Sequence, residues 1–138
     1  QARLSDMRVC DYAAEDAPIF SETTSQQEVL QYLRKTGWNE AYAVDSETQK
    51  FIGFLRAVDL EAGSETPIAG KLQISDLSFD ETTSVRQAME KLSSFVGDAI
   101  PIIKSSDGSL VGVVTEGAII QSYLNLAADL RREENAGL

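Results

Sequence analysis

An internal repeat constrains the fold of this chain more than any other feature of the sequence. The residues Glu-Thr-Thr-Ser at 22–25 recur at 81–84, a displacement of 59 residues. When this displacement is held over 20–60, 41 positions pair without a gap and eight of them are identical. Apolar positions also stay in phase, as in Val44 and Ile103. The sequence therefore predicts two copies of a unit of about 60 residues that fold alike.

A shorter match extends the repeat upstream. Val-Cys-Asp-Tyr at 9–12 resembles Ile-Ser-Asp-Leu at 74–77, and this match requires six additional residues in the first copy. Between the copies, Ile68, Leu72 and Ile74 are large apolar residues that favour burial. We therefore expect the region that joins the two copies to be packed against them, unlike a flexible linker.

Each copy contains the signals for a helix followed by two strands. Ser25 precedes Glu28 by three residues, and Ser84 precedes Gln87 by three, which is the spacing of a capping box. Apolar residues at helical spacing follow both serines. The last strand of each copy is nearly all apolar, so we expect it to be buried on both faces. The predicted strands lie at 18–20, 41–44 and 51–55 in the first copy and at 77–79, 99–103 and 110–114 in the second.

These elements define two units and a fold class. We assign the first unit to 9–62, a connector to 63–73 and the second unit to 74–134. A last helix follows the strands of each unit; it is short after Arg56 and long at 116–134. The predicted fold class is α+β, with two tandem β-α-β-β-α units that pack through their sheets about a pseudo-twofold axis. One unit of this size would have a marginal core, so we expect the two to share a core.

The composition excludes several kinds of site. The chain has 138 residues, a formal net charge of −10, no histidine and one cysteine, Cys10. Without histidine, a Ser-His-Asp triad, a Cys-His pair and a Cys/His zinc site cannot form, so we expect no enzymatic activity. A single cysteine cannot form an intrachain disulfide, and a low thiol content fits a reducing compartment. The acidic charge disfavours nucleic acid as a partner because phosphate backbones are repelled.

The order of the predicted elements is similar to that of a known family. The second copy has Asp-Ala-Ile-Pro-Ile-Ile at 98–103, Ser-Asp-Gly at 106–108 and Leu-Val-Gly-Val-Val-Thr at 110–115. The first copy has Glu-Ala-Tyr-Ala-Val-Asp at 40–45 and Ile-Gly-Phe-Leu-Arg-Ala-Val-Asp at 52–59. This pattern resembles the cystathionine-β-synthase (CBS) domain, and the doubling resembles the tandem CBS pair that is called a Bateman module.

The resemblance implies a regulatory role. Such pairs bind ATP, ADP, AMP or S-adenosylmethionine in clefts between the two copies, often form homodimers, and sit beside a catalytic or transport domain. The chain begins with Gln1 instead of Met, and no apolar run approaches the roughly 20 residues that cross a bilayer. We therefore expect a cytoplasmic piece of a longer polypeptide, such as the tail of a bacterial chloride channel or a similar transporter.

The first copy offers the better candidate for a ligand cleft. The family's motif places a Thr or Ser hydroxyl against phosphate and an Asp three residues later against the ribose hydroxyls. The first copy has Asp59, but Arg56 replaces the Thr and offers phosphate a charged fork. Tyr42 stands where proline is usual and offers its ring to adenine. The alternatives are that Asp59 only caps a helix, that Arg56 pairs with Asp59 or Glu61, and that Tyr42 is a partly buried strand residue.

The second copy keeps the other half of the motif. It has Pro101 in the strand and Thr115 at the phosphate position, but Ala118 replaces the Asp. An alanine side chain cannot hydrogen-bond a ribose. We therefore expect the second cleft to have lost ordinary nucleotide binding.

Two functions remain open from the sequence. In the first, the module senses an adenosine-type ligand and transmits its occupancy to an attached channel, transporter or enzyme. In the second, the clefts are degenerate and the module is a dimerisation scaffold that is indifferent to nucleotides. A homodimer is predicted from the apolar stripe of the last helix, which consists of Ile119, Ile120, Tyr123, Leu124, Leu126, Ala127 and Leu130.

Overall fold

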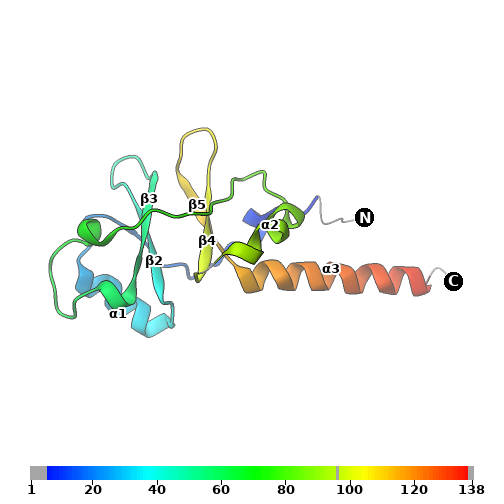
Figure 1. Ribbon diagram of the computed structural model, residues 1–138, viewed down its shortest axis with the longest axis horizontal. Helices are drawn as coiled ribbons and strands as arrows, with labels where there is room; N and C mark the ends of the chain where they lie inside the picture. The colour runs from blue at the N-terminus through cyan, green and yellow to red at the C-terminus, as the bar shows by residue number, and fades with distance from the viewer. Residues whose placement is uncertain (1–5, 96, 137–138) are drawn as a thin grey trace.

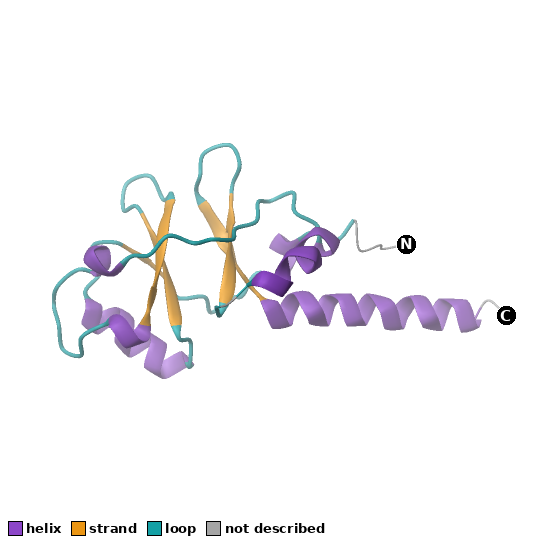
Figure 2. Ribbon diagram, viewed as in Figure 1, coloured by secondary structure: helices purple, strands orange, loops and turns teal. Residues whose placement is uncertain are grey.

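The computed structural model describes residues 6–95 and 97–136. Two small sheets lie side by side, helices pack at both outer sides, and a long helix extends away from the body (Figure 1). Strands and helices are mixed along the whole chain (Figure 2). This architecture confirms the predicted α+β class.

The strands form a three-stranded and a two-stranded sheet. β1 (Ile19–Ser21) runs parallel to β2 (Glu40–Val44), and β2 pairs antiparallel with β3 (Phe51–Arg56). In the second half, β4 (Ala99–Ile103) pairs antiparallel with β5 (Leu110–Thr115). The opening strand predicted at 77–79 is reduced to one parallel bridge between Phe79 and Ile102, which corresponds to the Phe20–Ala43 pair of the first half.

The helices differ in length between the two copies. The second helix of the first copy is only a 3₁₀ turn, because Leu60 leaves the helical region and is buried in the core of the first half. Its counterpart in the second copy has 21 residues. The α-helices are α1 (Gln26–Thr36), α2 (Val85–Lys91) and α3 (Glu116–Ala136), and the 3₁₀ helices are η1 (Val9–Tyr12), η2 (Ala57–Asp59), η3 (Ile68–Lys71) and η4 (Leu92–Ser94).

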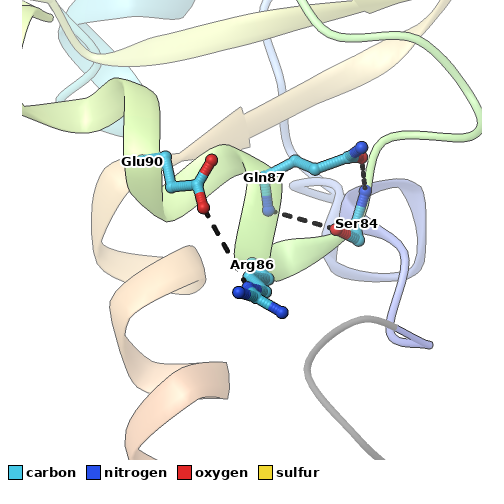
Figure 3. A network of polar contacts seen from close by, with 4 residues as sticks. All are labelled: Ser84, Arg86, Gln87 and Glu90. Carbon is cyan, nitrogen blue, oxygen red and sulfur yellow. Dashed lines mark hydrogen bonds and ion pairs between the residues drawn. The ribbon is translucent and has the colours of Figure 1, made fainter.

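Both predicted N-cap serines cap their helices, but the complete capping box is described only at Ser84. Ser84 Oγ accepts a hydrogen bond from Gln87 N at 3.1 Å, and Gln87 Oε1 accepts one from Ser84 N at 2.9 Å, which completes a capping box (Figure 3). One turn on, Arg86 and Glu90 form an exposed ion pair on the same helix (Figure 3). In the first copy, Ser25 Oγ accepts from Glu28 N at 3.2 Å. Each cap satisfies an amide of the first helical turn that has no partner within the helix.

Identical residues of the repeat make identical hydrogen bonds. Glu22 accepts a hydrogen bond from Ser46 N at 2.9 Å, and Glu81 accepts one from Ser105 N at 2.9 Å. Both pairs join residues that are 24 positions apart, and the second pair lies 59 residues after the first. The displacement read from the sequence is therefore the structural displacement as well.

The predicted upstream match is wrong, because the displacement of 59 continues through it without an insertion. Val9 N donates to the Thr83 carbonyl at 3.0 Å, and Ile68 N donates to the Thr24 carbonyl at 2.9 Å. Each residue of the second bond is related to one of the first by 59 positions, so Val9 corresponds to Ile68. Ile68 is fully buried, as expected, but Ile74 is 88% exposed, so the similarity of 9–12 to 74–77 is coincidental.

The leading segments of the two copies are exchanged. η1 lies beside α2 in the second half, and η3 lies beside α1 in the first half (Figure 1). Val9 of η1 is buried with Val85 and Ile100, whereas Ile68 of η3 is buried with Val29 among other residues. The core of each half therefore includes the segment that leads the other copy: η1 enters the core of the second half, and η3 enters the core of the first half.

The two halves also meet along a pseudo-twofold axis. Phe51 N donates to the Gly108 carbonyl at 3.0 Å, and Leu110 N donates to the Gln49 carbonyl at 3.2 Å. These two bonds are related to each other by the displacement of 59 residues. A small apolar cluster around the buried Tyr42 spans both halves; its other buried members are Ala99 and Val113.

The last strand of each copy is not buried on both faces as predicted. Ile52 of β3 is 37% exposed and Val111 of β5 is 46% exposed. The two positions are equivalent in the repeat, and the alternation of a strand turns both side chains away from the core. Apolar composition therefore overstated the burial of these strands.

Gly53 provides a test of the packing of the connecting segment. Its φ is 147°, and a Cβ atom there would lie 2.6 Å from the Gln73 carbonyl oxygen, which accepts a hydrogen bond from Phe54 N at 2.9 Å. We expect Gly53→Ala to lower the free energy of unfolding by about 2 kcal/mol in urea denaturation.

Gly70→Ala is the matched control for this change. A Cβ atom at Gly70 would have no heavy atom within 4 Å, and its φ is ordinary. We expect a change below about 0.5 kcal/mol there. Equal effects of the two substitutions would show that the approach of Gln73 to Gly53 does not constrain the fold.

Candidate functional site

A cavity of about 270 Å³ lies where the two halves meet. Strand geometry explains its composition: residues two apart on β2 share a face, and their partners on β3 share it too. Glu40 is opposite Arg56, and Tyr42 is opposite Phe54, so all four belong to the face at the junction. The cavity is lined by Glu40, Tyr42, Phe54, Ser75, Asp76, Leu77, Phe95 and Ala99.

Tyr42 forms the floor of this cavity and also joins the halves. Its hydroxyl donates to the Ala99 carbonyl at 3.4 Å, and its ring makes an edge-to-face contact with Trp38 at 6.4 Å between centroids. The side chain is only 1% exposed, so it is buried more deeply than the predicted alternative assumed. Burial raises the pKa of Tyr42, so the hydroxyl remains a neutral donor.

Arg56 and Asp59 do not line the cavity, but each contacts a residue in or near its lining. Arg56 ends β3 on the side of Glu40, and its charge offsets only part of the desolvation that raises the pKa of that carboxyl. Asp59 is exposed at the end of η2, where its Oδ2 accepts from Gln73 Nε2 at 3.4 Å. It is the last residue of that turn, so the alternative that Asp59 is an N-terminal helix cap is wrong.

The two candidate residues of the second copy lie elsewhere. Thr115 Oγ1 accepts from Ala118 N at 3.0 Å and so caps the first turn of α3. It lines a separate, shallow depression of about 260 Å³ together with Trp38 and Asp98. Pro101 is buried in β4, and its carbonyl accepts from Phe79 N at 2.9 Å. The structure therefore groups Tyr42 with the neighbourhood of Arg56 and Asp59, and separates this group from Thr115 and Pro101.

Glu40 is a feature of the cavity that the sequence motifs did not single out. Its Oε1 accepts from Asp98 N at 3.0 Å, while Asp98 Oδ2 accepts from Glu40 N at 3.0 Å and from Asn39 N at 2.6 Å. Desolvation by burial raises the pKa of Glu40, and the nearby Asp98 charge adds to this effect. The signal in the sequence was its position two residues before Tyr42 on a strand, which places both on one face.

The described residues offer no alternative centre for metal chemistry. Within 6–95 and 97–136, no group of three or more Cys, Asp or Glu side chains is arranged to hold a metal ion. In the same part of the chain, no helix combines the length and the apolar composition needed to span a bilayer.

The comparisons with known proteins identify the fold. The family model of the CBS domain matches residues 69–125. The structure of a CBS domain pair/ACT domain protein from Thermotoga maritima superposes with a TM-score of 0.76 over 87% of this chain and 98% of that chain, at 20% identity. The chain folds as a CBS-domain pair. The predicted tandem CBS architecture is thus confirmed.

Two further CBS-pair structures carry ligands. CBSX2, a CBS-pair protein of Arabidopsis thaliana, was solved in complex with AMP; it has a TM-score of 0.72, 18% identity, and coverage of 88% of this chain and 98% of that chain. CbpB in complex with c-di-AMP has a TM-score of 0.71, 18% identity, and coverage of 91% and 90%. Among curated proteins, no sequence matches the chain. At these identities the likeness concerns the fold of the CBS pair.

The buried position of Glu40 predicts a pH effect on stability. Because the pKa of Glu40 in the folded protein is above its ordinary value of 4.5, the native state binds more protons than the unfolded state between the two values. This contribution therefore lowers stability as the pH rises through that window. We expect Glu40→Gln, which lacks the titration, to gain stability relative to the wild type as the pH rises above 4.5, measured by urea denaturation at a series of pH values.

The control for this experiment is Glu90→Gln, which changes an exposed carboxylate of α2. This variant shows how much of any change with pH comes from removing a carboxylate in general. A stability difference for Glu40→Gln that does not change with pH would contradict the raised pKa of Glu40.

Proposed function

We propose that this CBS pair is a regulatory module that senses an adenosine-type nucleotide in the cavity between its halves. The observation that carries the proposal is the cavity itself, with aromatic side chains for a base and with Arg56 and Asp59 beside it. Pockets for small molecules are commonly apolar with a few placed polar groups. The AMP and c-di-AMP complexes of the similar structures support the ligand class.

In this proposal the ligand spans both halves. Tyr42 and Phe54 contribute the wall from the first half, and Phe95 and Ala99 contribute the wall from the second. Asp59 would accept hydrogen bonds from the ribose hydroxyls, and Arg56 would bind phosphate. A ligand that contacts both halves favours the arrangement in which both sets of contacts form, and this differential affinity is what an attached domain would detect.

The second cleft has a smaller part in the proposal. Thr115 uses its hydroxyl oxygen to cap α3, and the side chain of Ala118 has no polar group. Thr115 and Pro101 therefore remain candidate contacts only for a ligand without a ribose-specific anchor. We propose that the regulated parent domain is a channel, transporter or enzyme in the same polypeptide, with this module on the cytoplasmic side.

The role of Asp59 can be tested by calorimetric titration of AMP, ADP, ATP and S-adenosylmethionine, with and without Mg²⁺. If Asp59 binds the ribose, Asp59→Ala should weaken binding of the best ligand about tenfold, because charge-assisted hydrogen bonds are lost. Glu90→Ala removes an exposed carboxylate that does not line the cavity and should leave the affinity unchanged. No measurable binding by the wild type across the panel would reject the sensor function.

One observation favours a second candidate function, that of a dimerisation scaffold. The long helix α3 leaves the body of the molecule (Figure 1) and exposes Tyr123, Leu124 and Leu130 along its length. We propose that a second copy of this chain covers this face. Acidic and basic side chains both occur at the end of α3, at Asp129, Arg131 and Glu134 among others, so two copies would meet with charges of both signs.

Sedimentation velocity over a range of concentrations tests this interface. Leu124 is 51% exposed, and Leu124→Glu should shift the protein toward the monomer because a charge would be buried between the helices. Asn125→Glu adds the same charge at the neighbouring exposed position and should change the equilibrium much less. A wild type that sediments as a monomer at every concentration would refute the homodimer.

A further inference from the structure

The cavity has an unusual charge for a site that is proposed to bind a nucleotide. Its lining includes two carboxylates, Glu40 and Asp76, and contains no lysine or arginine. A phosphate group inside it would face like charge, which is costly when water is excluded. The part of the ligand that enters this cavity is therefore the part that brings hydrogen-bond donors.

Glu40 is held in a fixed position at the wall. Its Oε1 accepts the Asp98 amide at 3.0 Å, which anchors the carboxylate to the second half of the molecule. Gly97 keeps the space for this contact, since a Cβ atom there would lie 3.1 Å from Glu40 Oε1 and 2.9 Å from Phe95 Cζ. Gly97 also has a φ of 153°, which L side chains rarely adopt. A fixed acceptor beside an aromatic ring is suited to accepting a hydrogen bond from the edge of a flat base.

The carboxylate retains capacity for a ligand. An ionised carboxylate has about four acceptor positions, and the Asp98 amide and the Tyr42 hydroxyl occupy two of them. An exocyclic amine on a purine has two N–H donors and can bind there with a charge-assisted hydrogen bond. A purine with hydrogen at the same ring position has no donor to offer, and a carbonyl at that position would place lone pairs against the carboxylate.

We propose that Glu40 is the specificity-determining residue of this cavity and selects bases that carry an exocyclic amine at the 6-position of the purine. The inference rests on the proposed function, because it assigns the orientation of the nucleotide in the same cavity. The amine points to Glu40 at the junction of the halves, and the phosphate points away from the two carboxylates of the lining, Glu40 and Asp76. The negative charge of the lining thus fixes which end of the ligand enters.

The test compares AMP with purine riboside 5′-monophosphate, which lacks only the amine. In calorimetric titrations, the wild type should bind AMP about tenfold more tightly than the analogue. Glu40→Gln keeps the shape and an acceptor for the Asp98 amide but removes the charge, so it should reduce the preference to about twofold or less. Asp76→Asn is the matched control at the other carboxylate of the cavity and should keep the preference. Thermal denaturation verifies that each variant is folded.

The possible outcomes distinguish a failure of the proposed sensor function from a failure of the role assigned to Glu40. If the wild type binds neither compound, the proposed sensor function fails and this inference fails with it. If both compounds bind with equal affinity, the sensor function stands and the role of Glu40 is overturned. A preference that survives in Glu40→Gln but disappears in Asp76→Asn would also overturn the assignment to Glu40.

Discussion

The fold depends on the reciprocal contact between the two halves of the chain. Two backbone hydrogen bonds, from Phe51 to Gly108 and from Leu110 to Gln49, are related by the pseudo-twofold axis and link the turns of the two sheets. The exchanged segments η1 and η3 add a second pair of equivalent contacts, since each completes the core of the half that it enters. A unit of this size buries too little surface to be stable alone, so the exchange supplies what each core lacks.

The cavity arises where the two copies differ in sequence. A strictly symmetric pair would have two equal cavities, but Tyr42 corresponds to Pro101, Glu40 to Ala99 and Phe54 to Val113. The first half therefore supplies larger and more polar side chains to the junction than the second half. Duplication explains the shared fold of the two halves. Divergence at a few strand positions explains why a cavity with a carboxylate in its lining forms at the strands of the first half.

Much of the framework could be predicted from local sequence signals. The capping serines and the alternation of apolar residues act over a few positions, and the structure confirms the helices and the strand pairs that they predicted. The upstream register failed because four similar residues, 9–12 and 74–77, were given more weight than the constant displacement. Ile74 is apolar yet exposed, and the packing of Ile68 was the better guide.

The site was harder to predict because it depends on packing between distant segments. Sequence resemblance led to Tyr42, Arg56 and Asp59, which lie at or beside the cavity. It did not lead to Phe95 or Ser75, since only the packing of the second half against the first brings them next to Tyr42. Glu40 was overlooked for a similar reason. A glutamate at the start of a strand is normally solvated, but here a hydrogen bond from the Asp98 amide holds its carboxylate at the junction of the halves.

The length of α3 has a mechanical consequence. The helix has 21 residues, which corresponds to about 30 Å at the usual rise per residue. Its base is fixed by the Thr115 cap and by the buried Ile119 next to β5, while its far end is exposed. A tilt of about 5° at the base would therefore move the tip by roughly 3 Å, given that length. A rearrangement too small to disturb either core thus becomes a displacement of several ångströms at the tip of α3.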